Sequence, residues 1–206
     1  MSVTGPARNR MRHVAAVVFI AAVSLPLVRA YSDLNLPSFI GIGECRRCHE
    51  AEGIGNQYKS WASTPHARAY QLLQEQKSMA IAGKVSAGNP AENIACLKCH
   101  TTGGGKTEGT LTEGVGCEAC HGPGSLYHDF SNHASFDNRE ASYRKAISLG
   151  MYPVLGIDGI KAREKLCRFC HNEDRPCLPD SLEERKRQRL PLSLIADFVF
   201  KHPVRR

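Results

Sequence analysis

Eight of the nine cysteines in this chain of 206 residues stand in four copies of one pattern, Cys-x-x-Cys-His. The cysteine pairs are Cys45/Cys48, Cys96/Cys99, Cys117/Cys120 and Cys167/Cys170, and the histidines that follow them are His49, His100, His121 and His171. At this spacing, two thiols bond the vinyl groups of one porphyrin while the neighbouring imidazole binds its iron. The motifs therefore predict four covalently bound haem c groups, each with one histidine as its first axial ligand.

Two other chemistries use paired cysteines. The interval from Cys99 to Cys117, between the second and third motifs, also fits a four-cysteine zinc site, and any single Cys-x-x-Cys could be a redox dithiol. Neither requires the histidine that follows each pair. Haem attachment explains all four pairs and all four histidines with one chemistry, so we favour it over zinc or disulfide exchange.

The remaining histidines match the number of expected haems. Besides His13 near the N-terminus, four histidines lie outside the motifs, and they are His66, His128, His133 and His202. After Ala30 the chain has only two methionines, so histidine is the one residue type that could fill every sixth coordination position. We expect mainly bis-histidine haems, which have lower reduction potentials than haems with a methionine ligand.

Local sequence places these candidate ligands. Thr64 and Pro65 are a favourable N-cap and first-turn pair, and they predict a helix over 66–73 that begins with His66. Gly122-Pro123-Gly124 predicts a sharp turn, after which a short helix from Ser125 would carry both His128 and His133. His202 precedes Pro203, which ends any helix there.

The N-terminus predicts export. Three arginines precede an apolar stretch over 14–28 that is shorter than a membrane-spanning helix, and Ala30 ends a signal-peptidase cleavage pattern. We expect residues 1–30 to be a signal peptide and residues 31–206 to be one periplasmic tetrahaem domain. An uncleaved N-terminal anchor is the alternative, and only that form would contact a membrane. Cleavage removes four arginines and lowers the formal net charge from +7 to +3, which argues against nucleic-acid binding.

The expected fold is mostly α-helical with long irregular loops. Helices are predicted over 138–149, from residue 161 into the fourth motif, and over 181–189, whereas strand signals are weak. The porphyrins should supply much of the apolar core, so we expect the haem-free chain to be largely unfolded. The interval from Cys45 to Cys117 is nearly equal to that from Cys96 to Cys167, as it would be in a duplicated two-haem unit.

Three stretches in and between the motifs resemble the tetrahaem cytochrome c-554 family, namely 61–69 (WASTPHARA), 96–103 (CLKCHTTG) and 114–124 (GVGCEACHGPG). The resemblance implies a compact, mostly helical periplasmic electron carrier with closely packed haems, an arrangement that recurs in hydroxylamine oxidoreductase and cytochrome c nitrite reductase. It also implies distal ligands at the positions of His66 and His128. The His202-Pro203 pair near the C-terminus resembles the family as well. A haem in this family can lack a distal ligand, which would leave one iron open.

Function depends on the sixth coordination position. If every iron has six ligands, the protein can only pass electrons, and its partners are redox proteins such as other multihaem cytochromes or a periplasmic oxidoreductase. The alternative is a reductase of small nitrogen oxides or hydroxylamine at one five-coordinate haem. A third possibility is a subunit of a larger respiratory complex that docks through the basic run at 185–189. Cys177 is left over as one thiol outside the motifs.

Overall fold

The computed structural model describes residues 35–135, 137–156, 158–175, 177, 191 and 193. Its regular secondary structure in these residues is entirely helical. The α-helices are α2 (Ile42–His49), α3 (Gln57–Ala62), α4 (Ala69–Leu72), α5 (Gln76–Lys84), α6 (Ile94–His100), α7 (Cys117–His121), α8 (Phe130–His133), α9 (Arg139–Ser148) and α10 (Ile160–Cys170), and the 3₁₀-helices are η1 (Glu52–Ile54), η2 (Pro65–Arg68), η3 (Thr102–Gly105) and η4 (Glu108–Thr110). The predicted mostly α-helical class is confirmed for this part of the chain.

Several predictions fall on residues that the structure does not describe. These are the signal peptide over 1–30, the helix over 181–189, the basic run at 185–189, and His202. The described residues from Pro37 onward belong to one compact unit. Among the helices of the described ranges, none has the length and apolar composition needed to cross a bilayer.

Two predicted helices are confirmed. α9 begins after Asn138, whose side-chain oxygen accepts a hydrogen bond from the backbone N–H of Ala141, and it ends before Gly150, which has a φ of 109°. α10 carries the fourth motif at its C-terminal end, as the sequence predicts. The helix predicted over 66–73 is interrupted, because Arg68 leaves helical geometry between η2 and α4.

The prediction that one helix carries both His128 and His133 is wrong. The N–H groups of Tyr127 and His128 both donate to the carbonyl of Gly124, which closes a turn over 125–127. Asp129 is then extended, with a φ of −62° and a ψ of 139°, and α8 begins only at Phe130. His128 therefore lies before α8, whereas His133 is its last residue.

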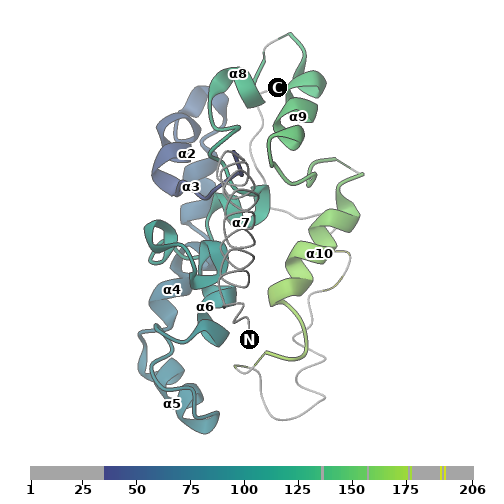
Figure 1. Cartoon of the computed structure of the whole chain (residues 1–206). Coiled ribbons are helices and arrows are strands. Elements are labelled where there is room, and N and C mark those ends of the chain that lie inside the picture. The colour runs from purple at the N-terminus through teal and green to yellow at the C-terminus, as the bar shows by residue number, and fades with distance from the viewer. Residues whose placement is uncertain are drawn as a thin grey trace, which may run out of the picture. The chain divides into compact units, whose positions relative to one another are not determined.

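The four motif helices lie next to one another in two pairs. α2 contacts α7, and α6 contacts α10, while α8 packs against α9 (Figure 1). Few side chains form a conventional core in the described residues, where the buried hydrophobic ones are Ile42, Ala69, Leu73, Ala82, Leu97, Tyr127, Ala146 and Val154. Four of these residues are smaller than leucine, so packing between side chains alone buries little apolar surface.

Glu118, the residue after the first cysteine of the third motif, holds the start of the domain against α7. It is only 2% exposed, and its carboxylate accepts hydrogen bonds from the N–H groups of Ile40, Gly41 and Gly124 at distances of 2.6 to 3.1 Å. Each carboxylate oxygen therefore accepts two of these bonds. A charged acceptor that serves three backbone donors satisfies groups that would otherwise be buried without partners.

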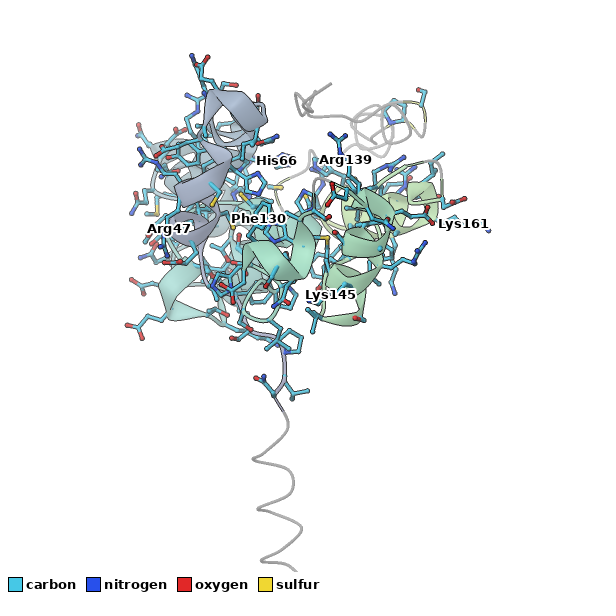
Figure 2. The ribbon with its side chains drawn as sticks, turned by 90° about the horizontal axis from the view of Figure 1, so that it is seen from above. Arg47, His66, Phe130, Arg139, Lys145 and Lys161 are labelled. Carbon is cyan, nitrogen blue, oxygen red and sulfur yellow. The ribbon has the colours of Figure 1, made fainter. Side chains whose placement is uncertain are left out.

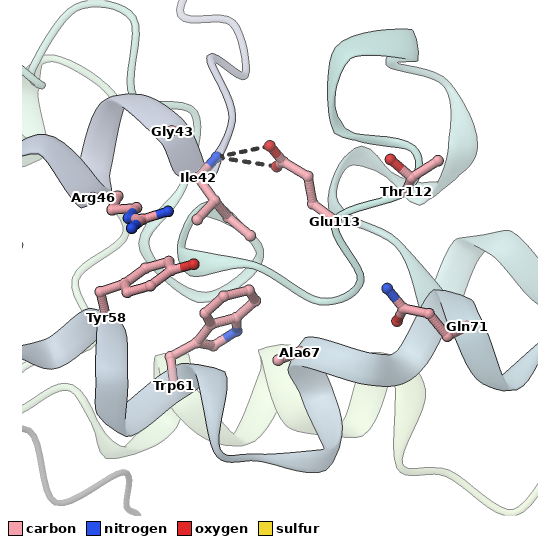
Figure 3. A pocket seen from close by; sticks show the side chains of 9 residues that line it. All are labelled: Ile42, Gly43, Arg46, Tyr58, Trp61, Ala67, Gln71, Thr112 and Glu113. Carbon is pink, nitrogen blue, oxygen red and sulfur yellow. Dashed lines mark hydrogen bonds between the residues drawn. The ribbon is translucent and has the colours of Figure 1, made fainter. Parts of the chain in front are cut away.

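A small cleft of about 300 Å³ lies beside α2 (Figure 3). Arg46 lines it and stacks on the Tyr58 ring, with 4.8 Å from the guanidinium carbon to the ring centroid, while Glu113 accepts hydrogen bonds from the Ile42 N–H. The indole N–H of Trp61 donates to the Val115 carbonyl at 2.9 Å. None of the predicted haem-binding cysteines or histidines lines this cleft.

Candidate haem centres

Each Cys-x-x-Cys-His motif stands at the C-terminal end of a helix. The histidine is the last residue of α2, α6 and α7, and in α10 it directly follows the last residue. Residues i, i+3 and i+4 share one face of an α-helix, so each motif directs two sulfurs and one imidazole to the same side. This is the arrangement that binding one macrocycle requires of a short segment.

The sulfur atoms of alternate motifs meet. The Cys45 thiol of the first motif hydrogen-bonds the Cys117 thiol of the third, and this contact together with burial raises the pKa of Cys45 far above its usual range. The Cys99 thiol of the second motif likewise hydrogen-bonds that of Cys170 in the fourth, which lowers the pKa of Cys99 to about 7. These pKa values describe free thiols, because a thioether does not titrate, but the contacts place the motifs in two pairs.

The two pairs of motifs approach each other at α7. Burial raises the pKa of Cys120 to about 11, and the next cause is the nearby thiol of Cys167 in the fourth motif. Cys120 in turn contributes to the raised pKa of Cys170. The sulfurs therefore connect the first motif to the third, the third to the fourth, and the fourth to the second.

Cys48 differs from the other cysteines of the motifs. The sequence predicts that all eight bond a macrocycle alike, but Cys48 is exposed, whereas the other seven are partly buried. The side chains before it also face solvent, since Arg46 and Arg47 are exposed and form ion pairs with Glu50 and Glu44 on the surface of α2. Haem attachment at Cys48 therefore stays a prediction from the Cys-x-x-Cys-His spacing, which the burial of its thiol does not support. A macrocycle bonded there would have one edge at the surface.

Two motif histidines face two of the predicted distal histidines. The ring centroids of His49 and His133 are 6.1 Å apart, and those of His66 and His171 are 6.0 Å apart. A metal–imidazole bond is about 2 Å long and the ring centroid lies about 1 Å beyond the nitrogen, so two imidazoles on opposite sides of one iron have centroids about 6 Å apart. Both pairs have the centroid spacing expected of two imidazoles on one iron.

Hydrogen bonds prepare four of the imidazoles for metal binding. In each, Nδ1 lies within hydrogen-bond distance of an oxygen that can only accept: His49 with Gln57 Oε1 (3.1 Å), His100 with the Ala69 carbonyl (2.6 Å), His128 with the Ser125 carbonyl (3.2 Å) and His133 with the Asp129 carbonyl (3.0 Å). Nδ1 must then carry the proton, which leaves the Nε2 lone pair for a metal. Sequence reasoning missed Gln57 and the Ala69 carbonyl, since no local pattern marks a partner that only the fold supplies.

Burial acts in the same direction at the other pair. It lowers the pKa of His66, and it lowers that of His171 with a further contribution from His66 itself. A neutral imidazole is the form that binds a metal, so both rings are held in the competent state. Figure 2 shows His66 directed toward the interior of the side-chain cluster.

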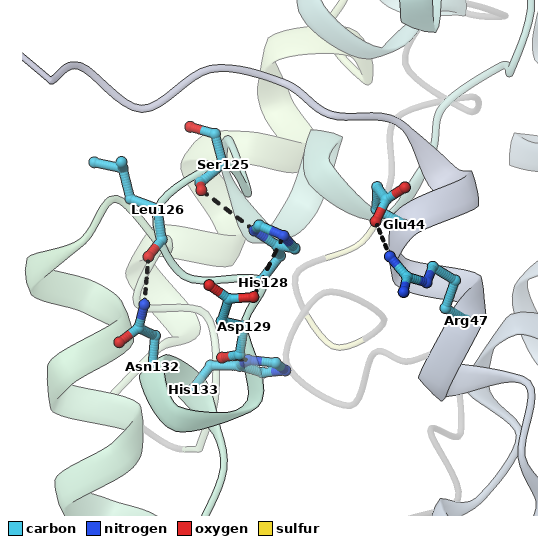
Figure 4. Close-up of polar contacts among 8 residues, drawn as sticks. All are labelled: Glu44, Arg47, Ser125, Leu126, His128, Asp129, Asn132 and His133. Atoms are coloured by element: carbon cyan, nitrogen blue, oxygen red, sulfur yellow. Dashed lines mark hydrogen bonds and ion pairs between the residues drawn. The ribbon is translucent and has the colours of Figure 1, made fainter.

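His128 and His133 occupy different settings (Figure 4). Nε2 of His128 lies 3.6 Å from the Asp129 carboxylate, whereas the ring of His133 faces both His49 and the edge of Tyr127. The structure therefore brings His133, and not His128, to a motif histidine. Cys177 is exposed and lies near the second motif, where its thiol contributes to the raised pKa of Cys96.

The zinc alternative has no support in the described part of the chain. No group of three or more histidine, cysteine, aspartate or glutamate side chains gathers there in a way that could hold a metal ion. Cys99 interacts with Cys170, Cys117 with Cys45 and Cys120 with Cys167, so Cys96/Cys99 and Cys117/Cys120 do not form the four-sulfur cluster that a zinc site between them would require.

Comparison with known proteins points to one family. Residues 44–122 match the family model described as cytochrome c554 and c-prime. The chain is also 32% identical over 125 residues to the cytochrome c-554 of Nitrosomonas europaea, an alignment that covers 55% of this chain and 51% of that protein. The chain thus spans about half the length of the curated relative that it matches. No solved structure matches the chain.

Proposed function

We propose that this chain is a periplasmic electron carrier with four haem c groups. The match of residues 44–122 to the family model of cytochrome c554 and c-prime supports the proposal, because covalent haem c is the cofactor of such proteins. The observation that carries the proposal is the pair of facing imidazoles, His49 with His133 and His66 with His171, each at the centroid spacing of a bis-histidine iron. An iron with two imidazole ligands has no position for a substrate, so it can only exchange electrons.

The sulfur contacts supply an order for the electron path. The cysteines interact in the pairs Cys45 with Cys117, Cys99 with Cys170, and Cys120 with Cys167. Each cysteine would bond the edge of its own macrocycle, so neighbouring sulfurs would bring two macrocycle edges near each other. Electrons would accordingly pass among the haems in the order first, third, fourth and second motif.

Axial ligands follow from the same geometry. We assign His133 to the iron bound by His49, and His66 to the iron bound by His171. His100 and His121 would bind the remaining two irons, with His128 and His202 as the candidate sixth ligands that the sequence offers. The family resemblance implies distal ligands at His66 and His128 without saying which iron each one binds, and the proximity of His133 to His49 is the reason for assigning His133 as a further distal ligand.

Low-temperature EPR of the oxidised protein tests this function. We expect low-spin ferric signals from at least the two paired irons, and a redox titration in which all haems reduce reversibly at low potential. His133→Ala should convert one low-spin signal to a high-spin one, while His128→Ala should leave the signal of that iron unchanged. If His128→Ala and not His133→Ala produced the high-spin signal, the ligand assignment would be wrong.

The comparisons do not favour the reductase that the sequence left open. Addition of nitric oxide or cyanide to the same EPR samples distinguishes the two functions, because either ligand binds only an iron with an open position. Spectra that do not change support an electron carrier. A signal that shifts, together with catalytic turnover of hydroxylamine or nitrite, would refute the proposal that the chain only carries electrons.

A further inference from the structure

The outer face of α10 carries an exposed stripe of two lysines and a phenylalanine. Lys161, Lys165 and Phe169 are all exposed, and Phe169 is 62% exposed although it is large and apolar. Residues four apart on a helix are about 40° apart around its axis, so these three lie within an arc of about 80° along about 12 Å. We call Lys161, Lys165 and Phe169 the α10 stripe. Figure 2 shows Lys161 projecting outward from the molecule.

The stripe ends at the fourth haem motif. Phe169 stands between Cys167 and Cys170, the two cysteines that would bond the macrocycle, and both are partly buried while Phe169 is exposed. A partner that covers the Phe169 ring would therefore lie within two residues of both thioether bonds. Covering the Phe169 ring would remove its apolar surface from water, which stabilises a contact by up to about 2 kcal/mol.

The other charges of α10 are already engaged within the domain. Arg163 donates to the carbonyls of Val154 and Gly156, and the Arg168 guanidinium pairs with the Glu164 carboxylate at 3.7 Å. Within the part of the chain that the structure describes, Lys161 and Lys165 have no ion-pair partner. Two aligned and unpaired ammonium groups complement carboxylates on another molecule.

We propose that the α10 stripe is the docking surface for an acidic redox protein, which exchanges electrons through the fourth haem. The inference rests on the proposed electron-transfer function. The two lysines steer and orient the partner, and Phe169 supplies the apolar centre of the contact, the combination by which transient interfaces gain rate and specificity. In the proposed order the fourth haem lies between the haems of the third and second motifs, so electrons can pass from it to either one.

The test measures the rate at which flavodoxin hydroquinone, a small acidic one-electron donor, reduces the oxidised holoprotein in a stopped-flow experiment. Charge reversal in Lys161→Glu/Lys165→Glu should lower the second-order rate constant about tenfold at low salt and flatten its dependence on ionic strength. Phe169→Ala should lower the rate at high salt as well, where steering is screened.

A matched control separates the site from net charge. Lys77 and Lys84 are exposed on α5, which carries no motif, and Lys77→Glu/Lys84→Glu changes the charge by the same amount. The rate constant of this control should stay within about twofold of the wild type. Equal losses in the two double variants would overturn the docking site, because net charge alone would then set the rate.

Dithionite distinguishes failure of the inference from failure of the proposed function. This small reductant needs no docking, so it should reduce all variants at the wild-type rate. If dithionite fails to reduce the wild-type haems, the electron-carrier function is refuted; if it reduces them and the lysine variants react normally with flavodoxin, only the docking site is refuted. Sedimentation of the wild type should show a monomer. If it shows a dimer that Lys161→Glu/Lys165→Glu abolishes, the α10 stripe binds a second copy of this chain and the proposed partner is wrong.

Discussion

The buried carboxylate of Glu118 should stabilise this protein more than its place in a short motif helix would suggest. Its two oxygens accept from three backbone N–H groups, those of Ile40, Gly41 and Gly124, which belong to two segments far apart in the sequence. Substitution by alanine removes all the acceptors at once. Substitution by glutamine keeps one oxygen and places an amide NH₂ against at least one N–H group.

The expected losses can be worked out from these contacts. A buried donor left without a partner costs about 1–3 kcal/mol, and a hydrogen bond to a charged group contributes about 1.5–3 kcal/mol. For Glu118→Gln, one unsatisfied N–H and the loss of charge give about 2–4 kcal/mol. For Glu118→Ala, three unsatisfied N–H groups give about 4–6 kcal/mol after partial relaxation. The total free energy of unfolding of a protein is about 5–15 kcal/mol, so the loss in Glu118→Ala would be a large part of it.

Guanidinium unfolding of the holoprotein, followed by far-UV circular dichroism, measures these differences. Haem content is determined in parallel by the pyridine haemochrome absorbance, because Glu118 lies between two cysteines of the third motif. Glu113→Gln is the matched control, since the Glu113 carboxylate is partly exposed and accepts from one N–H group, that of Ile42, and it should cost about 1 kcal/mol. If Glu118→Ala with full haem content unfolds within about 1 kcal/mol of wild type, the reasoning is refuted.

Three further predictions concern the backbone, the cofactors and the leftover thiol. Gly122→Ala should destabilise the holoprotein by about 1–3 kcal/mol, because φ of Gly122 is 83° and a Cβ atom would lie 2.6 Å from the Gly150 carbonyl oxygen. Gly43→Ala within α2 is the control and should be neutral or stabilising, since a Cβ atom there meets nothing within 4 Å. The denaturant midpoints of the two variants measure both effects. The chain produced without haem attachment should lack a cooperative thermal transition, and calorimetry showing one like that of the holoprotein would contradict a core built on the cofactors. Intact mass and thiol titration under denaturing conditions should give four haems and one free thiol, at Cys177, and a second free thiol would mean that a motif is not fully bonded, with the exposed Cys48 as the first position to examine.

The sequence predicts the helical class, α9 and the helix that leads into the fourth motif because their signals are local. Asn138 and Gly150 delimit α9 through an N-cap and a positive φ, and both are visible in a window of a few residues. The helix expected from Ser125 is wrong because the carbonyl of Gly124 accepts two N–H groups in a tight turn, and this competes with the helix that the composition favours. No local pattern reveals such a choice between two sets of hydrogen bonds.

In the candidate site, too, the local sequence predicts some features and only the fold shows the others. The motif cysteines and histidines are identified by spacing alone, whereas the partners of the imidazoles come from distant segments. His100 meets a carbonyl 31 residues away, and His66 faces His171 from the other half of the chain. Counting histidines predicts how many distal ligands to expect, whereas the contact between the rings of His133 and His49 appears only in three dimensions.

The contacts between motifs also explain the spacing of the motifs along the chain. Cys45 and Cys117 are the first cysteines of motifs one and three, and Cys99 and Cys170 are the second cysteines of motifs two and four, so these two contacts join equivalent positions, whereas the approach of Cys120 to Cys167 does not. A two-fold relation between two-haem halves produces contacts of this self-complementary kind. The near-equal offsets between alternate motifs are those that duplication of such a half would leave. Because His133 and His66 reach His49 and His171 from non-equivalent places, the relation is confined to the helices that carry the motifs, and the connecting segments differ.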